Sequence, residues 1–307
     1  MFLVILMYML FASTFTLGKA VLAYAQPIFF IGFRMTLGGI LLFLYLYLFK
    51  RNKIRLEKKH FWLFTQITIF HIFIAYVAEF WALQYLTSFK TALIYNLSPF
   101  ISALFAFFFF SEKMTLKKWI GLMIGFFGFF LILANGKSPG ELTKHAFAFF
   151  SWPELVLLLA VFSSVYGWAI FKKLSKEGYF PVMINGFGML TGGILALFAS
   201  FLVEGAPSLK IQSSSLIFDV WVFLGYSLLL ILIANVICYN LYGHLLKKYS
   251  ITLLSFAGFF TPLFAALFGN IFLREVPSIF FFMALTIVAF GLYLFYQSEL
   301  KQGYIKK

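Results

Sequence analysis

Two ionisable side chains, Arg34 and Glu79, lie inside long apolar stretches of the chain. A charged side chain within a bilayer costs several kcal/mol unless it is paired or hydrated, so both residues are candidates for binding or coupling. A guanidinium and a carboxylate could hold the two charged groups of a zwitterion, and Glu79 could also take up a proton. The alternative is a purely structural ion pair, which would neutralise both buried charges.

Polar and aromatic residues accompany this charge pair. His71 is either a hydrogen-bonded histidine of the bundle or a coupling group. The spacing of Asn235, Tyr239 and Tyr242 puts them on one face of a helix. Lipid cannot hydrogen-bond to an amide, so Asn96 and Asn235 should face protein or water. The candidate binding or coupling residues are therefore Arg34, Glu79, His71, Tyr95, Asn96, Tyr166, Asn235, Tyr239 and Tyr242. Such a site suits a small zwitterion or a heteroaromatic metabolite.

The composition predicts an integral membrane protein. Of 307 residues, 63% are hydrophobic and 11% are charged, against about 45–50% and about 25% in soluble domains. The net charge of +14 comes largely from Lys and Arg in short connections, which a bilayer explains better than nucleic acid does. The single cysteine, Cys238, excludes an intrachain disulfide and a thiolate metal cluster, and no cofactor or metal is expected.

The apolar stretches are long enough to be transmembrane helices, which need about 20 mainly apolar residues. They lack the alternation of barrel strands and are too long for them. The first stretch has no basic flank, so we interpret it as a span and not as a signal peptide. Ten spans are predicted, at residues 2–22, 28–49, 61–85, 91–110, 118–134, 152–171, 182–203, 219–243, 251–273 and 278–297.

The distribution of basic residues predicts the orientation. Connections after even-numbered spans, with the C-terminus, hold 17 Lys and Arg residues, and connections after odd-numbered spans hold 5. The positive-inside rule therefore places both termini in the cytoplasm of a multi-pass protein of the cell inner (plasma) membrane. In this orientation Arg34 and Glu79 each lie about 9 Å from the outer end of a span, at 1.5 Å per helical residue.

An internal repeat relates the two halves of the chain. Residues 32–43 align with residues 186–197 at an offset of 154, and residues 98–100 align with residues 261–263 at an offset of 163. The predicted units are residues 1–136 and 151–298, followed by a cytoplasmic tail at 299–307. Five spans per unit is an odd number, so the second unit is inverted. The predicted fold is an all-α integral membrane protein with ten transmembrane helices as two inverted five-helix repeats.

Inverted repeats are typical of secondary transporters that work by alternating access around a site near the midplane. Pro99 and Pro262 occupy matching positions inside spans 4 and 9, where each is expected to kink the helix as a pivot or cavity wall. The positions that match Arg34 and Glu79 hold Gly188 and Tyr242. A symmetric structural brace should have been duplicated, so this asymmetry favours a role in binding.

These features carry a family resemblance. The chain resembles the drug/metabolite transporter superfamily and its EamA-type permeases in two features. One is the series Lys19…Pro27…Arg34. The other is a proline followed, after twelve residues, by a glutamate in both halves of the chain. The resemblance covers essentially the whole chain, with Phe11-Ala12 where these permeases often have Trp-Gly. It implies a secondary transporter of metabolites, amino acids or xenobiotics, without specifying a substrate.

The function expected is therefore secondary active transport of an amino acid or a related zwitterionic or heteroaromatic compound across the bacterial inner membrane. The alternatives are uptake or exchange of a nucleoside-like metabolite such as S-adenosylmethionine, or a channel or membrane enzyme. The chain lacks a nucleotide-binding loop, and its acids and histidines are scattered, so it is not expected to be an enzyme. The expected partners are the bilayer, a small-molecule substrate and H⁺ as the candidate coupling ion, without nucleic acid. A monomer and a homodimer both stay open.

Overall fold

The computed structural model describes residues 2–110, 114–135, 151–206, 209–210, 212, 215–246, 254 and 258–302. These residues form helices joined by short connections. The described part of the chain contains no strand, and its only β-type pairing is an isolated bridge between Ala25 and Leu209.

The first half of the chain contains two long helices followed by three more bundle segments. The first of these three segments, residues 61–83, is one continuous rod in which a π-helical stretch, η3, separates two α-helices. In chain order the elements are α1 (Phe2–Val21), α2 (Pro27–Phe49), η1 (Arg51–Lys53), η2 (Lys58–His60), α3 (Phe61–Gln66), η3 (Ile67–Ile74), α4 (Ala75–Leu83), α5 (Ser88–Tyr95), α6 (Ser98–Phe110) and α7 (Leu116–Asn135).

The second half of the chain also contains a continuous rod with a π-helical stretch, η4. Its elements are α8 (Trp152–Lys176), α9 (Pro181–Val203), α10 (Leu216–Leu230), η4 (Ile231–Cys238), α11 (Tyr239–Leu245), η5 (Gly258–Phe260), α13 (Thr261–Leu273) and α14 (Ile279–Lys301). Local sequence signals explain several helix starts. Pro27 and Pro181 open α2 and α9, where a proline loses no intrahelical hydrogen bond. At the start of α8, the Glu154 carboxylate accepts the Ser151 N–H at 2.8 Å.

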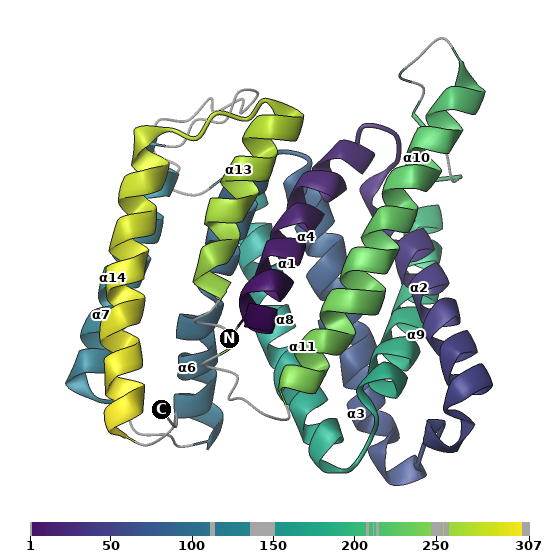
Figure 1. The fold of residues 1–307 in the computed structure, drawn as a ribbon, viewed down its shortest axis with the longest axis horizontal. Helices are drawn as coiled ribbons and strands as arrows, with labels where there is room; N and C mark the ends of the chain where they lie inside the picture. The colour runs from purple at the N-terminus through teal and green to yellow at the C-terminus, as the bar shows by residue number, and fades with distance from the viewer. Residues whose placement is uncertain are drawn as a thin grey trace.

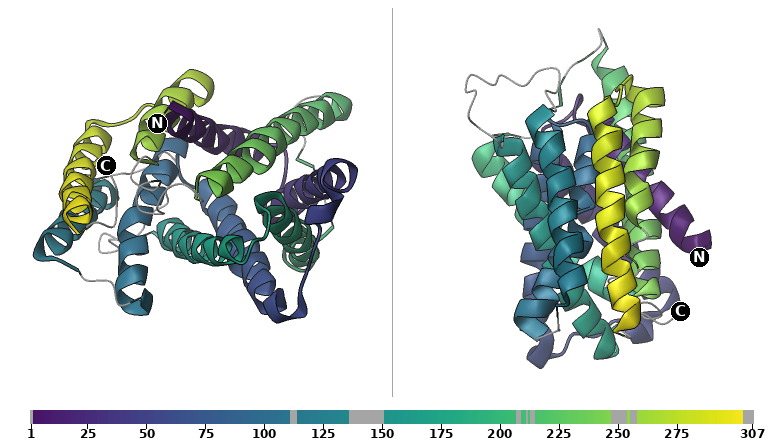
Figure 2. Two further views of the ribbon diagram at one scale, coloured as in Figure 1. Left: turned by 60° about the horizontal axis from the view of Figure 1, so that its bottom comes forward. Right: turned by 90° about the vertical axis from the view of Figure 1, so that its left-hand side faces the viewer.

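Helices from the two halves pack against each other across the bundle. Helix α2 packs along α9 at one side of the molecule, and α7 packs along α14 at the other (Figure 1). Between them α1 contacts α13, and α4 contacts α8. Figure 2 shows that the helices run broadly along one direction, with the connections gathered at two ends.

Glycines allow the closest of these contacts. A Cβ at Gly39 would lie 2.5 Å from the Leu190 backbone nitrogen, and a Cβ at Gly193 would lie 2.4 Å from that of Thr36. These glycines bring α2 and α9 together, as small residues do between membrane helices. On the other side, a Cβ at Gly121 would lie 2.6 Å from the Gly291 carbonyl oxygen, so glycines also allow α7 and α14 to pack closely.

Among the described residues, seven helical rods are long and apolar enough to cross a membrane: Leu3–Val21, Pro27–Phe49, Lys58–Leu83, Trp152–Lys176, Pro181–Val203, Leu216–Leu245 and Ile279–Ser298. Large apolar side chains such as Phe198 and Trp221 are more than 60% exposed on the outside of the bundle. A bilayer would cover such side chains, as expected for a multi-pass membrane protein. The three other predicted spans correspond to α5 with α6, to α7, and to η5 with α13, and most of residues 251–257 lie outside the described part of the chain.

The two prolines expected inside continuous helices occupy a different position. Helix α5 ends at Tyr95, and Pro99 is the second residue of α6. Pro262 is likewise the second residue of α13, after the short turn η5. A proline inside a helix removes a backbone hydrogen bond, whereas in the first turn it removes none, so each helix begins immediately before its proline instead of running through it. The result is an interruption of regular backbone near the middle of the bundle in both halves.

Candidate functional site

A cavity of about 140 Å³ lies in the middle of the bundle, next to both backbone interruptions. Its walls come from α1, α2, α4, α5 and α6 of the first half and from α8, η4, α11, η5 and α13 of the second half. Asn96 lines it at the end of α5, and Gly258 and Thr261 line it beside Pro262. The interruptions therefore form part of the wall, as membrane proteins require of irregular backbone at such depth.

Arg34 contributes the positive charge of the cavity. Its side chain is 1% exposed, and its guanidinium carbon lies 4.9 Å from the ring centroid of Phe80 and 5.0 Å from that of Tyr76. These contacts are cation–π interactions. The Nε and Nη2 atoms of Arg34 have no hydrogen-bond partner, and no described carboxylate forms an ion pair with the guanidinium. Arg34 is thus a buried cation with unused donors at a cavity.

Glu79 contributes the negative charge. It is 7% exposed, lines the same cavity, and accepts a hydrogen bond of 2.7 Å from the Tyr95 hydroxyl to its Oε2. Tyr95 lies on α5, so this bond joins α4 to α5. Arg34 and Glu79 therefore face one cavity without forming the ion pair that the structural interpretation of the sequence required.

Aromatic rings form the wall supplied by the second half of the chain. The ring centroid of Trp168 lies 4.2 Å from that of Tyr242 and 5.2 Å from that of Tyr239. Phe11 of α1 lies 6.2 Å from Tyr239 and 6.4 Å from Tyr242, with its ring edge-on to both. The Tyr76 hydroxyl donates to the Tyr239 hydroxyl, which connects this wall to the ring beneath Arg34.

The structure brings six of the nine candidate residues to the cavity, namely Arg34, Glu79, Tyr95, Asn96, Tyr239 and Tyr242. The other three lie behind its walls. His71 packs against the Trp168 ring at a centroid distance of 4.4 Å. Tyr166 points to Gln66 and donates to its Oε1 at 2.7 Å. Asn235 is 1% exposed between α2 and α9, with its Nδ2 3.1 Å from the Met35 sulfur.

Sequence reasoning missed several residues of the wall, including Phe11, Tyr76 and Trp168. Tyr76 precedes Glu79 by three residues, so the helical spacing that places two side chains on one face could have identified it. Phe11 and Trp168 carry no such signal in a chain with 46 phenylalanines and apolar residues on most helix faces.

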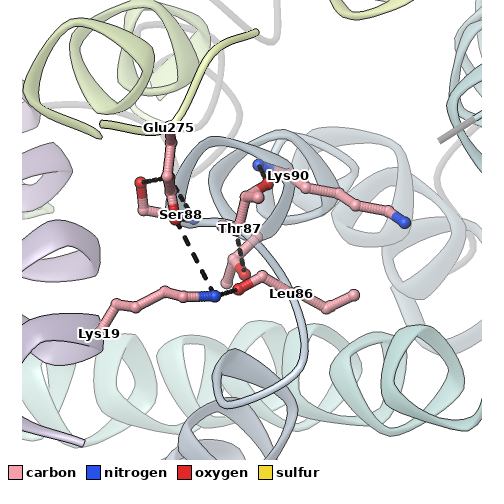
Figure 3. Close-up of polar contacts among 7 residues, drawn as sticks. Lys19, Leu86, Thr87, Ser88, Lys90 and Glu275 are labelled. Atoms are coloured by element: carbon pink, nitrogen blue, oxygen red, sulfur yellow. Dashed lines mark hydrogen bonds and ion pairs between the residues drawn. The ribbon is translucent and has the colours of Figure 1, made fainter. Parts of the chain in front are cut away.

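A second polar cluster lies at the end of the bundle where connections 22–26, 84–87 and 274–278 lie (the upper end in Figure 1). Glu275, between α13 and α14, accepts the Ser88 backbone N–H at 3.0 Å and thereby caps α5. Lys19 of α1 lies 3.9 Å from the Glu275 carboxylate and donates to the Leu86 carbonyl oxygen (Figure 3). The cluster thus ties α1, α5 and the α13–α14 connection together.

Lys90 lies two residues after Ser88 on α5, and its side chain points away from Glu275 (Figure 3). Its Nζ forms an ion pair of 2.7 Å with Glu154 of α8, and both side chains are about 5% exposed. Although the sequence places Lys90 in a polar connection, the structure buries it. This pair links the two halves of the chain. Neither of its residues lines the described cavity, whose charged lining residues are Arg34 and Glu79.

Comparisons with known proteins agree with this architecture. A model of the EamA-like transporter family matches residues 1–134 and 151–297. A protein of Chlamydia muridarum (strain MoPn / Nigg), named S-adenosylmethionine/S-adenosylhomocysteine transporter, is 35% identical over 99% of this chain and 93% of its own. A protein of the same name from Chlamydia trachomatis serovar D is 33% identical over 99% of this chain and 91% of its own. A solved crystal structure with 16% identity matches 98% of this chain and 97% of its own with a TM-score of 0.66, which shows a shared fold.

Proposed function

Because this chain belongs to the EamA-like transporter family, we propose that it is a secondary transporter of S-adenosylmethionine and S-adenosylhomocysteine. The observation that carries the proposed substrate is the similarity along 99% of the chain to proteins named for these two compounds. Both compounds carry an amino-acid group and an adenosine group. The cavity offers a charge pair for the first and aromatic surface for the second.

The transport mechanism proposed is alternating access between two inverted five-helix units, residues 1–136 and 151–298, with a tail at 299–307. Several features of the structure support this arrangement. The π-helical stretches η3 and η4 start 164 residues apart, close to the offset of the sequence repeat. The family model matches the chain in two parts. Moreover, α2 pairs with α9 and α7 pairs with α14, which are the partners that a pseudo-twofold axis would bring together.

The proposed membrane is the bacterial inner membrane, with ten spans and both termini in the cytoplasm. The Lys and Arg count supports this orientation, because the connections at the lower end of Figure 1 include residues 50–60, which hold six of these residues. The cluster around Glu275 would then face the outside and close the cavity from that side.

The amino-acid end of the substrate would bind between Arg34 and Glu79. The unused Nε and Nη2 donors of Arg34 suit a carboxylate, which a guanidinium binds with two parallel hydrogen bonds. The free lone pairs of Glu79 suit the ammonium group. Binding a zwitterion would pair both buried charges, and this provides a free-energy reason for the protein to keep them in the membrane.

A transport experiment tests the proposal. Purified protein is reconstituted into liposomes loaded with unlabelled S-adenosylhomocysteine, and uptake of labelled S-adenosylmethionine is followed. We expect saturable uptake that requires the internal load and that unlabelled S-adenosylmethionine competes. A channel would show neither saturation nor counter-transport, and an enzyme would change the compound chemically.

The competing candidate is a general amino-acid transporter, since Arg34 and Glu79 would hold any zwitterion. The same liposomes distinguish the two functions. If methionine and other amino acids compete as well as S-adenosylmethionine does, the adenosine group is not recognised and the substrate assignment is contradicted. If no labelled compound enters above the level of empty liposomes, the transport proposal itself fails for these substrates.

A further inference from the structure

The ring of Tyr76 connects the guanidinium of Arg34 to the aromatic residues of the cavity wall. The guanidinium carbon lies 5.0 Å from the Tyr76 ring, and the Tyr76 ring lies 5.9 Å from that of Tyr239. Tyr239 in turn contacts Trp168. Tyr239 and Trp168 therefore line the same cavity within reach of a ligand whose carboxylate binds Arg34.

Four rings surround this part of the cavity, and they come from three helices. Phe11 belongs to α1, Trp168 to α8, and Tyr239 and Tyr242 to α11. Trp168 is inclined by about 40° to both tyrosines, whereas Phe11 faces them edge-on at 66° and 76°. The centroids of contacting rings lie 4.2–6.4 Å apart, so the four rings form one packed aromatic cluster at the cavity and not a flat stack.

The charges of the described cavity lining lie elsewhere. Glu79 is the carboxylate and Arg34 the cationic group among the residues that line it, and both belong to the first half of the chain. A cation in the cavity beside Phe11, Trp168, Tyr239 and Tyr242 would therefore be stabilised by the aromatic rings, the interaction by which proteins bind quaternary ammonium groups.

The sulfur atom is the position at which the two proposed substrates differ. In S-adenosylmethionine it is a sulfonium, which is a permanent cation. The sulfonium has no N–H or O–H, so an acceptor on the protein cannot bind it through such a hydrogen bond. In S-adenosylhomocysteine it is a neutral thioether. Aromatic rings attract both, the first by cation–π interaction and the second by sulfur–aromatic contact. A transporter of both compounds needs a surface of this kind.

We propose that Phe11, Trp168, Tyr239 and Tyr242 form the binding site for the substrate sulfur and set the preference between the sulfonium and the thioether. This assignment rests on the proposed function and adds the residues that determine specificity. Three of these rings, Trp168, Tyr239 and Tyr242, belong to the half of the chain that places no charge at the described cavity.

The test is equilibrium binding to the purified full-length protein in detergent. The ligands are S-adenosylmethionine, S-adenosylhomocysteine, S-methylmethionine, which has the sulfonium without adenine, and methylthioadenosine, which has adenine without the amino-acid group. The variants are Trp168→Leu, which removes a ring, and Trp168→Phe, which keeps one. Trp152→Leu is the matched control, because Trp152 lies on the same helix and is 76% exposed.

We expect Trp168→Leu to weaken binding of S-adenosylmethionine and S-methylmethionine about tenfold, which corresponds to about 1.4 kcal/mol. Binding of S-adenosylhomocysteine should weaken less, by about threefold or below, because the sulfur–aromatic contact is weaker than a desolvated cation–π contact. Trp168→Phe should restore most of the preference for the sulfonium, and Trp152→Leu should match the wild type. Phe11→Leu repeats the test at another ring, in case Trp168→Leu does not yield folded protein.

Two outcomes overturn the assignment while leaving the proposed function intact. Equal weakening of both adenosyl compounds and of methylthioadenosine would show that the rings bind adenine. Unchanged binding of all ligands in Trp168→Leu and Phe11→Leu would show that the rings only pack. Failure of the wild-type protein to bind either adenosyl compound would instead contradict the proposed substrate, and the sulfur site with it.

Discussion

The first half of the chain supplies both charges of the described cavity lining, whereas the second half supplies aromatic rings and no charge. Arg34 and Glu79 face the cavity from α2 and α4, and Trp168, Tyr239 and Tyr242 face it from α8 and α11. The difference is built into the packing. At Gly188, the position that matches Arg34, a Cβ would lie 2.6 Å from a methyl carbon of Ile67, so a side chain there would require Ile67 to move.

This difference shows how a repeated architecture can hold an asymmetric ligand. Two identical walls would bind either end of a substrate equally well. Charges on one half and none on the other favour one orientation, with the charged amino-acid end of the substrate toward the first half. The following predictions test this division, from the largest expected effect to the smallest.

Removing the cation should have the largest effect. Arg34→Ala deletes the donors proposed to bind the substrate carboxylate, and the loss of one member of a buried charged contact costs about 2–5 kcal/mol. Transport should therefore fall by about thirtyfold or more, measured as the initial rate of uptake into liposomes. Arg51→Ala, at an exposed arginine of the lower end, is the control. Normal transport by folded Arg34→Ala protein would remove Arg34 from the site.

Neutralising the carboxylate should have the next largest effect. Glu79→Gln keeps an oxygen that can accept the Tyr95 hydrogen bond but loses the charge for the ammonium group. Hydrogen bonds to charged groups contribute about 1.5–3 kcal/mol, so substrate affinity should fall about tenfold or more. Glu57→Gln, at the lower end, serves as control. If Glu79 also carries a coupling proton, an imposed pH gradient changes the wild-type uptake rate. A wild-type rate independent of the gradient contradicts that second role.

Adding a side chain at Gly188, the position of the second half that matches Arg34, should destabilise the fold. The added methyl of Gly188→Ala meets the Ile67 side chain, and overpacking of this kind costs about 1–3 kcal/mol. Gly225→Ala is the matched control, because a Cβ there meets no atom within 4 Å. Thermal unfolding in detergent should show a lower midpoint for Gly188→Ala alone. Equal midpoints for the two variants would mean that the second half has room for a side chain at this position.

Weakening the upper cluster should have the smallest effect. Glu275→Gln lowers the charge at the start of α5 and loses the ion pair with Lys19, but it keeps an acceptor for Ser88. A carboxylate at a helix N-terminus contributes about 0.3–1 kcal/mol, so the unfolding midpoint should fall only slightly. A loss as large as that of Gly188→Ala would show that this cluster supports the fold more strongly than its hydrogen bonds indicate.

The sequence predicts where the helices lie better than it predicts which face of each helix points toward the cavity. Long apolar runs, and prolines at helix starts such as Pro27 and Pro181, are local signals, so the long rods appear where the pattern placed them. Local signals also identify Arg34 and Glu79, since a charge in an apolar run is conspicuous. The family assignment from the repeated proline and glutamate spacing is confirmed by the match to residues 1–134 and 151–297.

What could not be predicted is how each helix is rotated about its axis. His71, Tyr166 and Asn235 are polar residues in apolar runs, like those that reach the cavity, yet they pack behind its walls. When both faces of a helix are apolar, the pattern does not show which one faces a neighbouring helix and which faces a cavity. The same ambiguity hides Phe11 and Trp168, whose role depends on the partners that tertiary packing brings to them.

The central claim is that Arg34 holds the carboxylate of the substrate in the cavity. Its most direct test compares binding of S-adenosylmethionine and of its decarboxylated analogue to wild-type protein and to Arg34→Ala. The account predicts that the wild type binds S-adenosylmethionine about tenfold or more tightly than the analogue, as for loss of a charged hydrogen bond, and that Arg34→Ala binds both equally. The same preference in wild type and variant would contradict it.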